Sequence, residues 1–233
     1  MMPLWCWQRW GPAGMDEGVS CRHCKRAFTS QTVPTSILER SLQIAAQSPS
    51  SKNTQPWQVA VVRGDTKAAL VRAMCAKFDD RIVEAPDYVY TMTPMPSDFS
   101  KRARDCGHAL YALKGIDRED TAAREAHLRE NYTFFGAPVA LICHMPAQSE
   151  RGTFLDMGCF IQSLMVTLVE AGLGCCPQYS ICSYSDTIRQ IVGLGSDRWI
   201  ACGIAVGYPD ETAVVNTFVP NRLPLTAFTQ WLN

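Results

Sequence analysis

The sequence predicts an α+β fold in which a mixed β-sheet is flanked by helices. Short runs of β-forming residues alternate with longer segments of helical periodicity. Apolar residues occupy 47% of the 233 positions, so a sizeable core is available. No repeat or shift in composition divides the chain, and we therefore expect a single domain over residues 15–233.

The first 14 residues, MMPLWCWQRWGPAG, do not fit this pattern. They hold three of the six tryptophans, but they lack the basic start and the long apolar run of a signal peptide. We interpret residues 1–14 as a non-native or disordered extension and Met15 as the natural start of the protein.

The helical segments begin and end at recognisable signals. Residues 16–28 form a helical pattern that ends in a basic cluster, and Pro34 follows it. Ser36 and Glu39 then make a capping box for a helix over 37–46. The same periodicity predicts further helices over residues 67–78, 98–113, 120–130, 154–171 and 186–192.

Runs of β-formers predict four strands, over residues 57–62, 137–143, 175–179 and 199–206. Several prolines, tyrosines and methionines interrupt the pattern between residues 84 and 97, where we expect a loop or lid. Pro224 is expected to open a last helical turn.

The segment 154–171 is apolar nearly all round. Such a helix is buried on several sides, either in a core or at a subunit interface. Because it contains Asp156, Gln162 and Glu170, we do not interpret it as a membrane span.

Charge and cysteine content limit the functions and compartments to consider. The 22 basic and 22 acidic residues balance, so no strong field is available to hold nucleic acid or an anionic membrane. Eleven cysteines are scattered through predicted helices and strands, unlike an extracellular disulfide framework. We interpret most of them as buried thiols in the reducing cytoplasm. Cys21 and Cys24 form a C-x-x-C, but no second ligand pair completes a metal site.

Two polar stretches stand out. RHCKRAF, residues 22–28, places three cations within five residues. Arg22 and Arg26 lie four apart, on one face of the expected helix, where forked guanidiniums can hold a dianionic phosphate. A solvated basic helix end is the alternative. SPSSKNTQPW, residues 48–57, offers many hydrogen-bonding groups between a helix and a strand, which suits either a ligand loop or an ordinary turn.

Several catalytic motifs are missing from the sequence. There is no phosphate-binding P-loop, no dinucleotide G-x-G-x-x-G after a strand, no H-E-x-x-H and no G-x-S-x-G. The residues alone therefore nominate no side chain as a catalytic acid, base or nucleophile.

Taken in order, RHCKRAFT and SPSSKNTQPWQVAVV resemble the opening of the FMN-dependent nitroreductase family. The later blocks NYTFFGAPVALI, FLDMGCFIQSLMVTLVEAGLGCCPQ, IACGIAVGYPDE and NRLPL continue the resemblance, which covers roughly residues 16–232. It implies a homodimer with FMN at the subunit interface and the long helix 154–171 buried at its centre.

The resemblance also implies roles for individual residues. Arg22, Arg26 and Arg222 would hold the phosphate, and His23 and Cys24 would line the isoalloxazine and ribityl side. The residues reaching the flavin from the other subunit would be Pro49, Ser50, Ser51 and Asn53. The residues bordering the flavin ring would be Asn131, Pro177, Gln178 and Tyr179. Cys24 departs from the family, which commonly has serine there, and a thiol donates a weaker hydrogen bond.

The implied activity is transfer of hydride from NADH or NADPH to FMN and then to a nitroaromatic or quinone-type acceptor, in ping-pong order. The flavin carries the chemistry, and we expect no catalytic side chain and no metal. For the acceptor pocket we nominate residues 86–99 and Phe134 or Phe135, which could equally be core or loop anchors. Three alternatives stay open: a flavin-storage protein, an oxidoreductase of a biosynthetic intermediate, and a flavin-free thiol–disulfide protein using Cys21 and Cys24.

Overall fold

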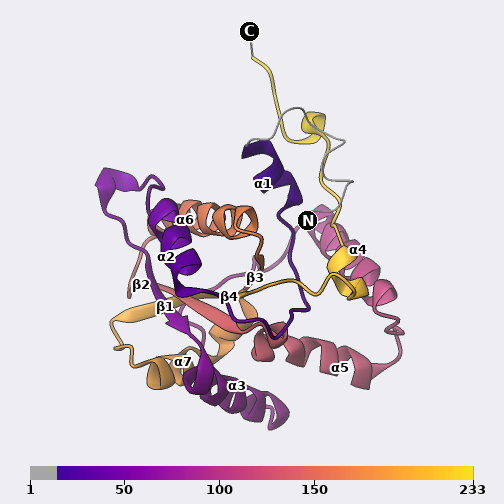
Figure 1. The fold of residues 1–233 in the computed structure, drawn as a ribbon. Coiled ribbons are helices and arrows are strands. Elements are labelled where there is room, and N and C mark those ends of the chain that lie inside the picture. Colours follow the sequence, from indigo (N-terminus) through magenta and orange to yellow (C-terminus); the bar gives the residue numbers. More distant parts are fainter. Residues whose placement is uncertain (1–14, 233) are drawn as a thin grey trace.

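The computed structural model describes residues 15–232, and its centre is a four-stranded sheet with helices on both faces (Figure 1). The strands follow the order β1-β2-β4-β3 across the sheet, and each pairing is antiparallel. The strand bounds are β1 Gln58–Val62, β2 Val139–Pro146, β3 Gly174–Gln178 and β4 Arg198–Gly207. The α+β class and the flanking helices are confirmed, whereas the strand directions in the described part are uniformly antiparallel. Residues 1–14, the predicted extension, lie outside the described residues.

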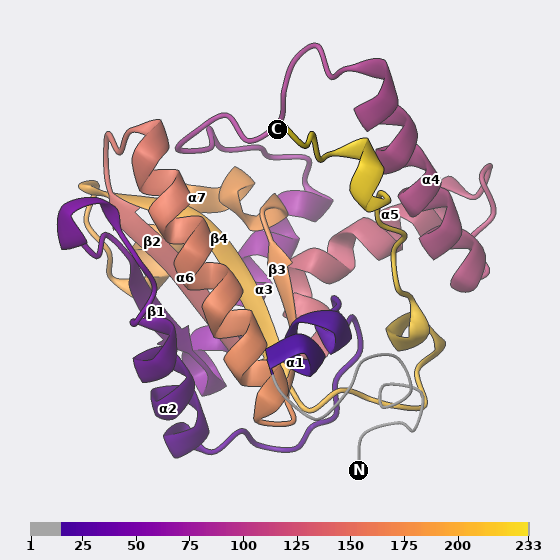
Figure 2. The ribbon, with the colours of Figure 1, turned by 90° about the horizontal axis from the view of Figure 1, so that it is seen from above.

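The helices form two layers. On one face lie α2 (Thr35–Ala45) and α6 (Arg151–Glu170), with the short α1 (Met15–Cys21) against α6 (Figure 2). The opposite face is covered by α3 (Gly64–Asp79) and α7 (Ser185–Val192), while α4 (Ser97–Leu113) and α5 (Thr121–Arg129) extend to one side. The 3-10 turns are η2 Ser51–Asn53, η3 Glu130–Gly136, η4 Ser180–Tyr184, η5 Val214–Thr217 and η6 Leu225–Ala227.

The first five residues of strand β2, 139–143, form an unbroken apolar run rather than an alternating one. Its side chains point alternately to the two faces of the sheet. Leu141 and Cys143 enter the core beneath α2 and α6, whereas Ala140 and Ile142 enter the core that faces α3 and α7. A strand buried on both faces needs apolar residues at every position.

Helix α6 is buried on one side only. Met157, Phe160 and Leu164 face the sheet with at most 2% exposure, whereas Leu155 is 74% exposed. By length and composition alone α6 could cross a membrane, but its buried side packs as a core helix does. The other side of the helix is exposed at Leu155, Gly158, Cys159 and Gln162.

The helix predicted over residues 16–28 is wrong beyond Cys21. From Arg22 to Phe28 the chain is extended and runs beside β3. The N–H of Lys25 donates to Cys175 O at 3.1 Å, and Phe28 forms a bridge with Pro209. The approach is close, because a Cβ on Gly174 would lie 2.8 Å from Lys25 Cγ. Pairing with the edge of the sheet thus overrides the local helical pattern of this segment.

The capping box predicted at Ser36 and Glu39 is also wrong. Helix α2 begins at Thr35, so both residues lie inside it, and no side chain caps it. Pro34 occupies the N-cap position with extended backbone angles and provides the start of the helix instead.

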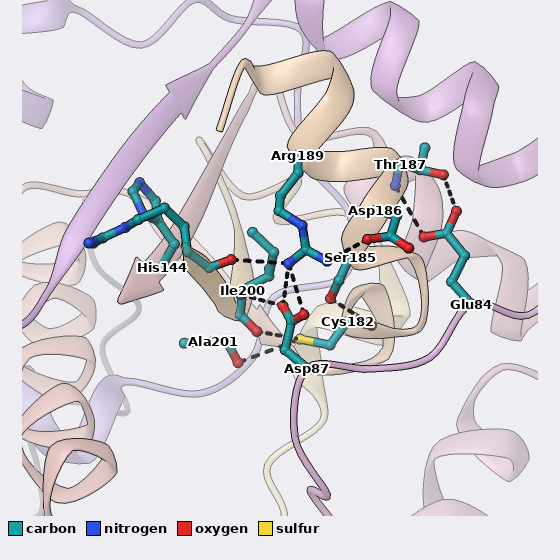
Figure 3. A network of polar contacts seen from close by, with 11 residues as sticks. Glu84, Asp87, His144, Cys182, Ser185, Asp186, Thr187, Arg189, Ile200 and Ala201 are labelled. Atoms are coloured by element: carbon teal, nitrogen blue, oxygen red, sulfur yellow. Dashed lines mark hydrogen bonds and ion pairs between the residues drawn. The ribbon is translucent and has the colours of Figure 1, made fainter. Parts of the chain in front are cut away.

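The predicted loop between residues 84 and 97 is irregular, but its first part is firmly anchored (Figure 3). Both carboxylate oxygens of Asp87 accept hydrogen bonds from Arg189 Nη1 at 2.8 Å, and one also accepts the Ile200 N–H at 2.8 Å. Glu84 accepts from the Thr187 N–H at 3.1 Å and pairs with Lys77. The loop is therefore tied to α7 and β4 and is not a free lid over this part.

Asp87 and Arg189 are 8% and 14% exposed, so they form a largely buried ion pair. We expect Asp87→Ala to lower the free energy of unfolding by about 3–5 kcal/mol, because it leaves the Arg189 guanidinium without its main partner. Urea unfolding measures the change. Asp105→Ala, which breaks an exposed pair with Lys101 on α4, is the control and should leave the urea midpoint unchanged. Equal midpoints for the two variants would contradict the expectation.

Candidate functional site

The extended segment 22–28 sorts its side chains into two sets. Alternate residues of an extended chain point to opposite sides, so Arg22, Cys24 and Arg26 share one side. On the other side, the His23 ring and the Lys25 ammonium both reach the backbone oxygen of Asn216. The two arginines were predicted to lie on one face of a helix. They do share a side, but because alternate residues of an extended chain point the same way.

Asn216 holds this segment in place. Its side-chain oxygen accepts the N–H groups of Arg26 and Ala27 at 2.7 and 3.2 Å. Its side-chain NH₂ donates to the backbone oxygens of Ala27 and Asp210 at 2.8 and 2.9 Å. Asn216 is 3% exposed, so these contacts are shielded from water. The sequence analysis missed this residue, because a single asparagine in an irregular stretch has no motif.

His23 is engaged with the backbone. Its Nδ1 lies 2.9 Å from Cys21 O and its Nε2 lies 3.2 Å from Asn216 O. Burial, and then the positive charge of Lys25, lower the pKa of His23 below its ordinary value, so the ring is neutral at pH 7. A neutral imidazole donates only one of these two hydrogen bonds. The structure therefore places His23 as a support of the segment, on the side opposite Cys24.

Cys24 is a free, half-buried thiol among positive charges. A hydrogen bond with Cys176 lowers the pKa of Cys24 to about 6 against the opposing effect of burial, and the charges of Arg26, Arg22 and Arg222 act in the same direction. Arg222, from the far end of the chain, thus lies in the same neighbourhood as the two arginines of the segment. We call Arg22, Cys24, Arg26 and Arg222 the arginine cradle.

The cradle has unused capacity for an anion. Among the ion pairs of residues 15–232, none includes Arg22, Arg26 or Arg222. The Nε of Arg22 is buried and has no hydrogen-bond partner. Three guanidiniums without carboxylates favour a multiply charged ligand such as a phosphate group.

A second part of the site adjoins the cradle along β3. Pro177 and Gln178 follow Cys176 at the end of this strand, and Tyr179 comes next. The Gln178 NH₂ group donates to Asn131 O at 2.5 Å, whereas its side-chain oxygen is buried without a partner. Asn131 and Gln178, predicted as a flavin edge, are thus brought together. An unpaired donor at Arg22 and an unpaired acceptor at Gln178 fit a planar polar cofactor with a phosphate, such as FMN.

Tyr179 joins this region to the loop 84–97. Its ring stacks on Tyr90 with centroids 4.1 Å apart and planes 17° apart. Of the residues nominated for an acceptor pocket, Phe134 and Phe135 are 0% and 8% exposed and pack in the core. Their interpretation as core anchors is therefore correct. In the loop itself, Val89 and Met92 are 88% and 54% exposed and remain available to line a pocket.

The predicted flavin loop lies away from the cradle of the same protomer. The Ser51 N–H donates to both carboxylate oxygens of Asp156 at 3.2 Å, near the start of α6. Gly18, just before the cradle, packs instead against Val166 and Glu170 near the end of α6. At 1.5 Å per residue, these two points on α6 are separated by about 15 Å or more. Figure 2 shows the loop that includes η2 and helix α1 at opposite ends of α6. This loop contains Pro49, Ser50, Ser51 and Asn53.

Within residues 15–232, no three His, Cys, Asp or Glu side chains come together as a metal site. Cys24 is a free thiol, so the two cysteines of the C-x-x-C are not joined to each other.

Asn216 offers a direct test of how the cradle is held. Asn216→Ala leaves buried N–H and C=O groups of the segment unpaired, and we expect it to cost about 2–4 kcal/mol of unfolding free energy. Because the segment contains trypsin sites at Arg22, Lys25 and Arg26, limited trypsin digestion should cut the variant there first. Asn221→Ala, at an exposed position nearby, is the control. Unchanged cleavage and stability in Asn216→Ala would show that the sheet pairing alone holds the segment.

Comparisons with known proteins identify relatives that match nearly the whole chain. The model of the nitroreductase family matches residues 19–208. A 4-nitrobenzoate reductase of Pseudomonas putida is 32% identical over 221 residues, covering 93% of this chain and 95% of its own. The crystal structure of an FMN and NADPH-dependent nitroreductase NfnB from Sphigopyxis sp. strain HMH superposes with a TM-score of 0.92 at 36% identity, covering 95% of this chain and all of the other.

The FMN-dependent nitroreductase NfnB from Mycobacterium smegmatis, solved in complex with NADPH, is similarly related. Its TM-score is 0.90 at 31% identity, and the match covers 94% of this chain and 97% of the other. Arg222 lies beyond the residues that the family model matches, but its charge acts on Cys24 in the structure. The resemblance inferred from the sequence is confirmed, and the chain belongs to the nitroreductase family.

Proposed function

We propose that this protein is an FMN-dependent NAD(P)H oxidoreductase that reduces nitroaromatic or quinone-type acceptors. The observations that support it best are the arginine cradle, whose three guanidiniums form no ion pair within residues 15–232, and the unpaired buried oxygen of Gln178. Relatives that match nearly the whole chain are named as nitroreductases, and two of the solved ones are named as using FMN with NADPH.

In this proposal each side chain has a positioning role. Arg22, Arg26 and Arg222 hold the phosphate, and Gln178 with Asn131 offers hydrogen bonds to the polar edge of the ring. Pro177 and Tyr179 border the ring, and His23 supports the cradle segment from behind. The bound flavin supplies the hydride chemistry, accepting hydride from NADH or NADPH and passing it to the acceptor.

We further propose that the working form is a homodimer. The loop residues Pro49, Ser50, Ser51 and Asn53 are too far along α6 to complete the cradle of their own protomer, as the contacts of Asp156 and Gly18 indicate. A two-fold partner would bring its loop to the cradle and would cover the open side of α6. Two equivalent sites then form at the interface.

The nine free cysteines of the described residues fit the reducing cytoplasm, where we place the protein. The alternatives from the sequence have distinct outcomes. A flavin-storage protein would be yellow but would not consume NADH or NADPH with any acceptor. A thiol–disulfide protein would be colourless, and an enzyme of biosynthesis would turn over a dedicated substrate but not nitroarenes.

Purified protein should show the absorption of an oxidised flavin, and the chromophore released by denaturation should be FMN. We expect NADPH or NADH oxidation that depends on added 4-nitrobenzoate or a quinone, with an initial-rate pattern of parallel lines. Arg22→Ala with Arg26→Ala removes two charge-assisted contacts of about 1.5–3 kcal/mol each, so FMN should bind at least about a hundredfold more weakly. Arg104→Ala, exposed on α4, is the matched control. Unchanged FMN affinity in the double variant would contradict the assigned phosphate site.

A mixing experiment tests the shared site. One variant loses the arginines (Arg22→Ala with Arg26→Ala) and a second loses the loop (Ser50→Ala with Asn53→Ala). Provided that each homodimer has lost FMN binding, random exchange of subunits should restore about one quarter of the sites, since half of the dimers are mixed and each mixed dimer has one intact site. If both parts came from one protomer, mixing would restore none.

A further inference from the structure

Cys24 and Cys176 lie together at the base of the arginine cradle. Cys24 packs against the buried cluster that contains Cys176, which is 2% exposed. The hydrogen bond from the Lys25 N–H to Cys175 O fixes the extended segment beside β3 at this point. The two thiols interact, since each is the first cause of the other's shift in pKa, lowering that of Cys24 and raising that of Cys176. The neighbouring Cys175 belongs to the opposite core, where its Sγ lies 3.9 Å from Met165 O.

We propose that Cys24 and Cys176 are a peroxide-sensitive thiol pair, which forms a disulfide when the cradle holds no FMN and is protected when FMN is bound. This inference rests on the proposed FMN site, because it assigns that site a redox modification. The proposal depends on the position of Cys24 and Cys176, which lie near each other and near the three arginines of the cradle.

The chemistry requires a hydroperoxide as oxidant. The Cys24 thiolate attacks one peroxide oxygen, the O–O bond breaks, and Cys24 becomes a sulfenic acid while hydroxide leaves and takes up a proton. The Cys176 sulfur then attacks the Cys24 sulfur, the S–O bond breaks, and the leaving hydroxide takes the Cys176 proton. In sum, two thiols and one hydrogen peroxide give one disulfide and two waters.

Among the free thiols, Cys24 is best suited for the first step. The Cys176 hydrogen bond and the charges of the cradle hold its pKa below the ordinary range of a thiol, so the reactive thiolate is populated at pH 7. By contrast, burial raises the pKa of Cys175 to about 12. Cys106 and Cys159 are free, exposed thiols on helices α4 and α6, away from the arginine cradle in sequence.

Bound FMN would oppose this reaction through the same charges. A phosphate and the Cys24 thiolate are both anions, and both are stabilised by Arg22, Arg26 and Arg222. The dianionic phosphate therefore favours the protonated thiol, which can donate a hydrogen bond to it and is a poor nucleophile. It also covers the cradle and limits the access of peroxide.

The test compares the full-length protein stripped of FMN with the same protein saturated with FMN. Each is treated with hydrogen peroxide, alkylated and digested, and the linked peptides are identified by mass spectrometry. We expect a Cys24–Cys176 link that dithiothreitol reverses, forming roughly tenfold or more slowly with FMN bound. Cys176→Ala should abolish the link, whereas Cys175→Ala, one residue away in β3, should retain it. A link from Cys24 to Cys21, no link, or equal rates with and without FMN would overturn the proposal.

The two proposals can fail separately. If the purified protein binds no FMN by absorption, the proposed function fails, and the protection by FMN fails with it, whatever link the stripped chain forms. If FMN binds and supports turnover but peroxide does not join Cys24 to Cys176, only the redox inference is overturned.

Discussion

The edge pairing of the segment 22–28 with β3 is the constraint on which the candidate site depends. In a helix, the backbone groups of these residues would hydrogen-bond to one another, and the side chains would point in different directions around the helix axis. Outside any helix or strand, the segment instead needs hydrogen-bond partners from elsewhere, and Asn216 and Cys175 provide them. The cost of leaving buried backbone groups unpaired makes this arrangement specific. It also fixes the direction of Arg22 and Arg26, because their side is set by the pleat.

The sequence predicted the fold well where periodicity and burial agree. The strands and most helices lie within a few residues of their expected positions, since apolar patterns such as that of β2 report a core directly. The helix prediction was wrong for residues 22–28, where contacts with distant parts of the chain decide the structure. The capping box predicted at Ser36 was wrong because Pro34 occupies the N-cap position of the helix instead. The site residues were named through the resemblance, while spacing alone left them ambiguous. Asn216 was missed because its partners are almost 200 positions away in sequence.

The long helix α6 links the fold to the proposed assembly. One side of it is exposed at Leu155, and its two ends lie near the two halves of the proposed site: the loop at Asp156, and beside Glu170 the helix α1 that leads into the cradle segment. A two-fold axis across the exposed side of α6 would place unlike ends next to each other. One apolar surface would then both drive association and complete each site, so that binding of FMN and dimer formation stabilise one another.

The thiol of Cys24 adds a titratable group to the proposed phosphate site. A serine hydroxyl would be neutral at any relevant pH and would leave all three guanidiniums to the phosphate. The thiolate of Cys24 would instead compete for them, so binding of the phosphate at the proposed site would favour a proton on the sulfur. Affinity for FMN is thereby linked to pH near neutrality, and binding weakens as pH rises because the proton becomes harder to supply. The arginines that contribute to the low pKa of Cys24, after Cys176, are thus the same ones that we propose to hold the phosphate, so the thiolate and the phosphate would compete for them.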